Sequence, residues 1–303
     1  MNGVLAAMLT PQNEDGSICL QRFTDHGKRL LSEGCDGLVP FGTTGEFPCF
    51  TVSERMAALD AMISGGIPAQ KIIVGTGACA LPDMAVLSRH AMDHDCAGVL
   101  AGPPFYFKQL SNDAIFETYA GLIKDVGNDI RLYLYHFPEM SSVPIPISVI
   151  ERLHHEYPRQ LSGLKDSAGD IAYSQKLIDR FPDLKIFTGD DDLLLANLQA
   201  GGAGSITAAS NIAVRDLCAV RDNWRSGAVE IAEEKDRLLR TLWSGLLLNY
   251  PVTEALKEIF AAYSGSDDWL TMRLPLVRLN EGDRKQLLDG FSKLELDISP
   301  DFF

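Results

Sequence analysis

One lysine stands within an apolar, strand-like run at 161–167, which reads LSGLKDS. Alternate side chains of a strand share a face, so Lys165 is expected on the same side as Leu161 and Gly163. Burial there disfavours the charged ammonium, and a neutral amine can condense with a ketone to form a Schiff base. Two other interpretations stay open at this point, because Lys165 can instead reach solvent at the strand end or pair with Asp166.

The segment GTTGE at 42–46 offers groups that bind an anion. Its glycines permit a sharp turn, and after Gly42 the amides of Thr43 and Thr44 can form a nest for a carboxylate, with their hydroxyls available to relay protons. A simpler interpretation is a turn ahead of the next helix, whose start is predicted by the capping-box pattern TVSE at 51–54.

Three other segments carry polar or aromatic residues that suit a site. RLYLYHFP at 131–138 contains Tyr135, whose phenol can exchange protons with a carbonyl bound to the lysine; His136 beside it either lines the site or points outward. GDDD at 189–192 is either a helix cap or a contact for substrate hydroxyls. PPFYFK at 103–108 serves either packing or an interface.

Strand-like runs alternate with amphipathic helical stretches over the first two thirds of the chain. The strand candidates are 4–9, 37–41, 71–75, 98–102, 131–137, 161–167, 184–188 and 204–208. The helical patterns between them are 20–32, 52–63, 83–94, 114–126, 147–157, 173–181 and 193–200. This alternation predicts a parallel sheet with right-handed crossovers, closed as a (β/α)8 TIM barrel. The first turn, at 10–16, lacks the GxGxxG of a dinucleotide site.

The rest of the chain is mainly helical, with candidates at 214–248, 254–262 and 282–294. We therefore expect a barrel core over 1–212, and over 213–303 the last barrel helix followed by a helical C-terminal extension. Active sites of such barrels lie where the strands end, so the segments with candidate chemistry are expected to meet at one face.

Charge and cysteine usage exclude several classes of protein. A formal net charge of -14 over 303 residues works against binding to nucleic acid or to an anionic membrane. The start, MNGVLAAMLTPQ, has no basic segment and no long apolar run, so we expect a cytoplasmic protein. The six cysteines form no CxxC pair, and His90 and His94 lack the glutamate of HExxH. We therefore expect a solvated helix face at the two histidines, and neither a metal nor a cofactor.

Taken together, four motifs resemble the N-acetylneuraminate lyase and dihydrodipicolinate synthase family of pyruvate-dependent class I aldolases. They are GTTGE after strand two, the Pro-aromatic-Tyr loop after strand four, Tyr-x-x-Pro after strand five and Gly-x-Lys-Asp-Ser on strand six. The resemblance covers nearly the full length. It implies that Lys165 forms the imine, that Tyr135 is the general acid/base, and that Thr43 and Tyr106 from a neighbouring subunit complete a proton relay.

The resemblance also implies a substrate class and an assembly. Pyruvate or another 2-oxo acid is the expected substrate, and a homo-oligomer is expected, with the dimer as the minimum active unit and a homotetramer as the complete assembly. The expected substrate-binding residues are Gly42, Thr43, Thr44, His136, Asp191, Asp192, Ile206 and Thr207.

Departures from the family pattern narrow the expected substrate. Members that condense aspartate semialdehyde carry an arginine where this chain has Met140, so a second carboxylate would lack its clamp. Sialic acid lyases usually have serine at the positions of Thr43 and Ala208. The motifs are closest to those of aldolases of 2-oxo-3-deoxy sugar acids, which release pyruvate and a hydroxy-aldehyde. A sugar-acid dehydratase, a dihydrodipicolinate synthase-type condensation and a non-enzymatic 2-oxo acid binding module remain alternatives.

Overall fold

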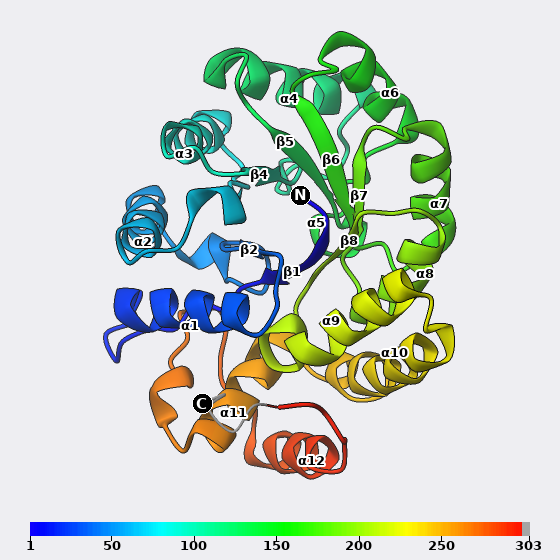
Figure 1. Cartoon of the computed structure of the whole chain (residues 1–303). Helices are drawn as coiled ribbons and strands as arrows, with labels where there is room; N and C mark the ends of the chain where they lie inside the picture. The colour runs from blue at the N-terminus through cyan, green and yellow to red at the C-terminus, as the bar shows by residue number, and fades with distance from the viewer. Residues whose placement is uncertain (299–303) are drawn as a thin grey trace.

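Eight parallel strands form a barrel at the centre of the structure, and helices surround it (Figure 1). The computed structural model describes residues 1–298. The strands are β1 (Gly3–Ala7), β2 (Gly37–Val39), β3 (Ile73–Gly75), β4 (Gly98–Ala101), β5 (Leu132–His136), β6 (Leu161–Asp166), β7 (Lys185–Thr188) and β8 (Gly204–Thr207). Their order is β2-β1-β8-β7-β6-β5-β4-β3, and a parallel bridge between Leu38 and Ile72 joins the two ends. Each strand overlaps its predicted stretch, so the TIM-barrel prediction is confirmed.

The helices of the outer ring follow the strands along the chain. They are α1 (Leu20–Ser32), α2 (Val52–Ser64), α3 (Leu81–Asp93), α4 (Asn112–Val126), α6 (Ile147–Glu156), α7 (Ile171–Arg180), α8 (Leu194–Gln199) and α9 (Ser210–Ser226), with a short α5 (Pro138–Ser141) after β5. The predicted capping box is present at the start of α2, where the side chains of Thr51 and Glu54 each accept the other's backbone N–H. In the described part of the chain, every helix is too short or too polar to cross a membrane.

The C-terminal third differs from the prediction in one place. The stretch expected as one helix over 214–248 consists of α9 and α10 (Val229–Trp243). Gly227 ends α9 with a φ of 82°, a left-handed conformation that glycine adopts without a steric penalty. The chain then continues into α11 (Val252–Ser264) and α12 (Glu281–Phe291), which lie outside the ring of helices in Figure 1.

The strands separate two apolar clusters. The barrel interior contains Leu5, Ala7, Val39, Ile73, Leu100, Tyr133, Phe187 and Ile206. The larger cluster lies between the strands and the helices, and it includes Leu161 and Leu164 of β6. The predicted face for Leu161 is therefore wrong. The pairing of β5 with β6 shifts by one residue between Leu132 and Tyr133, and this irregularity turns Leu161 away from the face that carries Lys165.

The C-terminal extension reaches the GTTGE loop through a buried ion pair. Lys257 of α11 lies 2.5 Å from a carboxylate oxygen of Glu46, and neither side chain is exposed. Gln12 donates to the other oxygen of Glu46 at 2.8 Å, and Lys257 also donates to the carbonyl of Thr271 at 3.0 Å. Burial raises the pKa of Glu46 and lowers the pKa of Lys257, and their mutual attraction opposes both effects.

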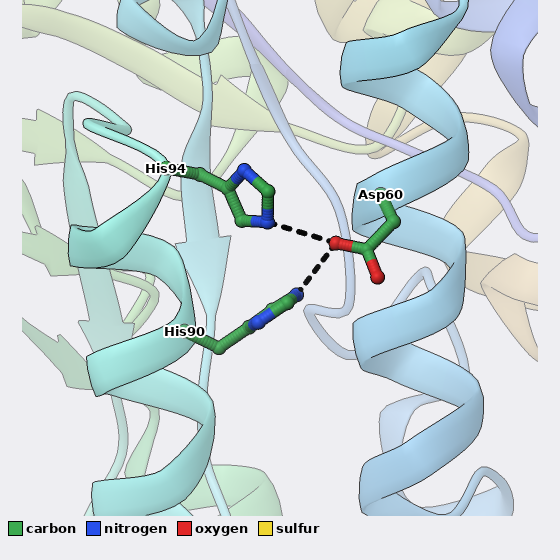
Figure 2. Close-up of side chains that lie close together, drawn as sticks. All are labelled: Asp60, His90 and His94. Carbon is green, nitrogen blue, oxygen red and sulfur yellow. Dashed lines mark ion pairs between the residues drawn. The ribbon is translucent and has the colours of Figure 1, made fainter.

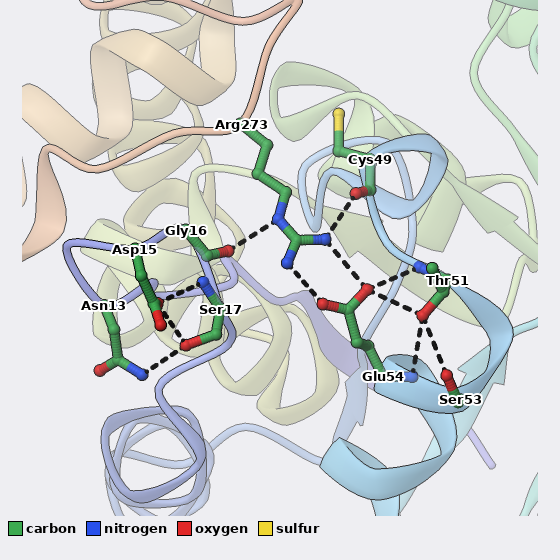
Figure 3. A network of polar contacts seen from close by, with 9 residues as sticks. All are labelled: Asn13, Asp15, Gly16, Ser17, Cys49, Thr51, Ser53, Glu54 and Arg273. Carbon is green, nitrogen blue, oxygen red and sulfur yellow. Dashed lines mark hydrogen bonds and ion pairs between the residues drawn. The ribbon is translucent and has the colours of Figure 1, made fainter.

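A second polar network holds the extension to the start of α2 (Figure 3). The guanidinium of Arg273 donates to both carboxylate oxygens of Glu54, at 2.9 and 2.5 Å. It also donates to the carbonyls of Gly16 and Cys49, at 2.7 and 3.0 Å. One side chain thus joins the loop after β1, the segment before α2 and the chain that follows α11. This two-pronged contact lowers the pKa of Glu54 to about 2, chiefly through the hydrogen bonds from Arg273.

We predict that Lys257→Met destabilises the fold by about 3–5 kcal/mol, because it leaves the Glu46 carboxylate buried without its partner. The free energy of unfolding in urea measures this loss. Glu46→Gln combined with Lys257→Met removes both charges and is expected to recover most of it. Arg180→Met is the matched control: Arg180 pairs with Glu151 at the surface, and its loss costs less than about 1 kcal/mol. Equal stabilities of the Lys257 and Arg180 variants would contradict the prediction.

Candidate active site

Lys165 lies inside the barrel, near the end of β6, and its side chain is 5% exposed. It pairs in register with Tyr135 of β5, so both side chains lie on the same face of the sheet. The amino group donates to the phenol oxygen at 3.4 Å and lies 4.5 Å from the centre of the ring. Lys165 therefore does not extend to solvent at the strand end.

Asp166 points away from Lys165, towards the helices. Its carboxylate accepts the hydroxyl of Ser174 at 2.7 Å and the amide of Ala168 at 3.1 Å. Burial raises the pKa of Asp166 to about 6. The alternative in which Lys165 pairs with Asp166 is thus excluded by the alternation of the strand, and the lysine faces the phenol instead.

Gly189, at the end of β7, leaves the space that Lys165 occupies. A Cβ at this position would lie 2.9 Å from the Cε of Lys165 and 1.8 Å from the hydroxyl oxygen of Ser167. Any side chain larger than hydrogen would displace one of these groups. This close approach explains why a glycine begins the GDDD segment.

The GTTGE loop supplies a hydroxyl group that contacts the phenol of Tyr135. The hydroxyl of Thr43 lies 3.0 Å from the phenol of Tyr135. Phe41, directly before the loop, and Glu46, its last residue, adopt φ values of 59° and 57°, a left-handed conformation that is unfavourable for residues other than glycine. The surrounding contacts must hold this conformation, and the ion pair of Glu46 with Lys257 is one of them.

The backbone amides of the same loop are available for an anion. Within residues 1–298, no protein acceptor takes a hydrogen bond from the amide of Thr43 or of Thr44. Thr44 is 8% exposed and Gly42 lines the cavity beside it, so an anion bound here is largely withdrawn from water. Two adjacent amides of this kind suit a carboxylate.

A small cavity opens next to Tyr135, with a volume of about 130 Å³. Aromatic and glycine residues from β2 to β5 form most of its wall, and Met140 completes it. The described residues that line it carry no charge; they are Phe41, Gly42, Thr43, Phe47, Pro48, Gly75, Gly77, Leu100, Gly102, Pro103, Phe105, Tyr135, Phe137, Met140 and Ser141. The nearby Lys108 donates to the carbonyls of Phe105 and Ser141, which occupies its ammonium.

Some residues expected at the site lie elsewhere. His136 faces the helices: it stacks on Tyr173 with ring centres 4.5 Å apart, and its Nδ1 accepts the amide of Ile145 at 3.1 Å. Burial lowers the pKa of His136 to about 4, so the ring is neutral at pH 7. The structure gives His136 a packing role and does not bring it to Lys165. The reason is again the strand period, since His136 follows Tyr135 and points the opposite way.

Two of the aspartates after β7 also form structural hydrogen bonds. Asp191 is fully buried and accepts the amide of Ala209 at 3.0 Å, and burial raises its pKa to about 7. Asp192 accepts the hydroxyl of Ser244 after α10. Thr207 lies beside them, buried, while its neighbour Ile206 belongs to the barrel interior. Ile206 is thus placed inside the barrel, whereas Asp191 and Asp192 are engaged with Ala209 and Ser244.

Asp190 is the residue that the sequence analysis did not select from GDDD. Burial raises its pKa to about 6, the charge of Asp192 adds to this effect, and the charge of Lys165 opposes it. Asp190 therefore interacts electrostatically with the candidate nucleophile. Asp190 directly follows Gly189, which adjoins Lys165, and only the folded structure reveals this closeness.

Tyr106 is not part of the site within one chain. It is 75% exposed, and its ring contacts Phe107 with centres 5.3 Å apart. Its predicted role in a neighbouring subunit stays a prediction.

Comparisons with known proteins place this chain in a family. The profile of the dihydrodipicolinate synthetase family matches residues 1–293. An uncharacterized DapA-like lyase of Chloroflexus aurantiacus is 35% identical over 302 residues, which cover 98% of both chains. The crystal structure of dihydrodipicolinate synthase from Agrobacterium tumefaciens aligns with a TM-score of 0.86 and 30% identity, covering 97% of this chain and all of the other. YagE of E. coli, solved in complex with pyruvate, aligns with a TM-score of 0.89 and 24% identity over 98% of this chain and 99% of its own.

We predict that Tyr135→Phe lowers kcat about 10²- to 10⁴-fold, because it removes the proton donor that contacts both Lys165 and Thr43. Steady-state kinetics measure the loss. The variant should still form an imine between Lys165 and pyruvate, since the amine remains. Tyr133→Phe is the matched control, because this tyrosine lies deeper in the same strand, and it should retain near-normal turnover. Equal activity of both variants would show that the phenol of Tyr135 has no part in proton transfer.

Proposed function

Because the chain belongs to the dihydrodipicolinate synthetase family, whose members are class I pyruvate-dependent lyases, we propose that it is an aldolase that cleaves or forms a 2-oxo-3-deoxy acid. Pyruvate is one partner in this proposal, and an aldehyde without a second carboxylate is the other. The observation that carries it is the line formed by the Lys165 amine, the Tyr135 phenol and the Thr43 hydroxyl, with successive distances of 3.4 and 3.0 Å.

Each group has a defined task in cleavage. The Lys165 amine attacks the 2-oxo carbon, and loss of water gives a protonated imine, with the substrate carboxylate on the amides of Thr43 and Thr44. The Tyr135 phenol gives its proton to the hydroxyl that leaves as this water, and so becomes a phenolate. The phenolate takes the proton of the 4-hydroxyl as the C3–C4 bond breaks and the aldehyde forms; the electron pair moves to the imine nitrogen and leaves an enamine. Tyr135 then returns a proton to C3, and hydrolysis of the imine releases pyruvate and the free lysine and restores the phenol.

The apolar cavity supports the restriction on the aldehyde. An arginine that grips a second carboxylate would stand at position 140, and this chain has Met140 there, in a wall that carries no charge among the described residues. A carboxylate placed in such a cavity would lose its hydration without gaining a partner. Of the residues expected to bind sugar hydroxyls, Asp191 and Asp192 accept hydrogen bonds from Ala209 and Ser244, and Thr207 is fully buried at the end of β8. We therefore favour an aldehyde with few hydroxyl groups over a sugar.

The test of the chemistry is reduction of the protein with borohydride in the presence of pyruvate, followed by peptide mass spectrometry. A pyruvyl adduct on Lys165 is the expected result. Lys185→Met is the control, since this lysine lies on β7 next to β6 and its loss should leave the adduct unchanged, whereas Lys165→Met abolishes it. An adduct on another lysine, or none, would overturn the proposal. An adduct only with a longer 2-oxo acid, with water lost and no pyruvate released, would indicate a dehydratase.

The specificity is tested by Met140→Arg. In the wild-type protein we expect kcat/KM for a neutral aldehyde to exceed that for aspartate semialdehyde by at least about tenfold, because the carboxylate of the semialdehyde has no counter-charge. The arginine should raise kcat/KM for the semialdehyde by about 10- to 100-fold, the worth of one charge-assisted pair. Met140→Lys provides a point charge without the planar fork and should give a smaller gain. A wild-type preference for the semialdehyde would indicate a dihydrodipicolinate synthase-type condensation.

A further inference from the structure

Three side chains that bind metals in other proteins meet on the outer surface of the barrel, between α2 and α3 (Figure 2). His90 lies in the last turn of α3 and His94 caps its C-terminal end four residues later, while Asp60 faces both from α2. The Nε2 atoms of His90 and His94 lie 2.9 and 2.8 Å from the same oxygen of Asp60. One atom from each of the three residues lies within 4.8 Å of the other two.

The contact of His90 with Asp60 is not a well-formed hydrogen bond. The Nε2 of His90 is buried, and it has no hydrogen-bond partner although the carboxylate oxygen lies 2.9 Å away. A second pair on the surface shows the contrast, since His154 makes a hydrogen bond of 2.8 Å to Asp183. A buried nitrogen without a partner is unusual and requires an explanation. A cation between the three atoms would accept the lone pair of the His90 Nε2 nitrogen.

The donor set matches one class of cation. Two imidazoles and one carboxylate suit Zn²⁺ and similar transition ions, whereas Mg²⁺ and Ca²⁺ prefer oxygen ligands. Zinc binds histidine nitrogen and carboxylate oxygen at about 2.0–2.2 Å, and three protein ligands leave the fourth tetrahedral position to water. The side chains of Asp60 and His94 are 51% and 34% exposed, so an ion and its water can reach the site.

We propose that Asp60, His90 and His94 bind a divalent transition ion of the zinc type, which joins α2 to α3. From the sequence we expect no metal here, because HAMDH lacks the glutamate of HExxH. The fold supplies the third ligand from the neighbouring helix instead. His94 lies at the C-terminal end of α3, and in this barrel the helices run opposite to the strands, so the ion would lie towards the end remote from Lys165. Its role is structural, and turnover does not depend on it.

The experiment is titration of the metal-free protein with Zn²⁺. Calorimetry measures the Kd and the number of ions bound, and the melting temperature measures the stabilisation. We expect one ion per chain, and a rise in Tm of about 5 °C when free zinc exceeds its Kd about 100-fold. Asp60→Asn and His94→Ala should each weaken binding at least about tenfold and remove the rise in Tm. Both positions are partly exposed, so the variants are expected to fold, which their circular dichroism and their Tm without zinc verify.

His154→Ala is the matched control, because it also removes a surface histidine that pairs with an aspartate, but that aspartate contacts one imidazole and not two. It should bind zinc as the unmodified protein does. Cobalt provides a second probe: its absorption should show tetrahedral coordination without a thiolate band, since no cysteine takes part. The proposal would be overturned if the unmodified protein failed to bind zinc. It would also be overturned if the Asp60 and His94 variants bound zinc as tightly as the unmodified protein does. Neither result would affect the imine chemistry at Lys165.

Discussion

The buried ion pair of Lys257 and Glu46 is the interaction on which the candidate active site depends most. Two charges without solvent exposure are stable only together, so the pair fixes the distance between α11 and the GTTGE loop. The loop needs such a partner, because Phe41 and Glu46 adopt left-handed backbone conformations. The C-terminal extension therefore takes part in building the site, although Lys165 and Tyr135 come from the barrel.

The barrel positions the three reactive groups, which are an amine, a phenol and a hydroxyl. Parallel register brings Lys165 beside Tyr135, and the loop after β2 adds Thr43 on the other side of the phenol. The neighbourhood is withdrawn from water, which strengthens each hydrogen bond and favours transfer of a proton along them. The same strand period sends Asp166 and His136 outward, where they support the helices.

The two ends of the barrel differ in what their side chains offer. Where the strands finish, glycines and aromatic residues leave a small apolar cavity beside the phenol, with the GTTGE loop at one side. Towards the opposite end, α2 and α3 bring two imidazoles and a carboxylate together. Chemistry and a structural cation can thus be separated in one domain, because the strands and the helices end at opposite faces.

The sequence by itself determined the eight strands and the helices between them, because alternation and helical periodicity are local properties. It also singled out Lys165, Tyr135 and Thr43 as candidates, through motifs that resemble those of a family. Tertiary structure decided what depends on contacts between distant segments. It turned Leu161 outward through an irregular pairing, brought Gly189 against Lys165, joined Lys257 to Glu46, and brought Asp60 to His90 and His94. None of these contacts has a signature in local spacing, since each joins residues that are distant in the chain and meet only when the barrel and its extension have folded.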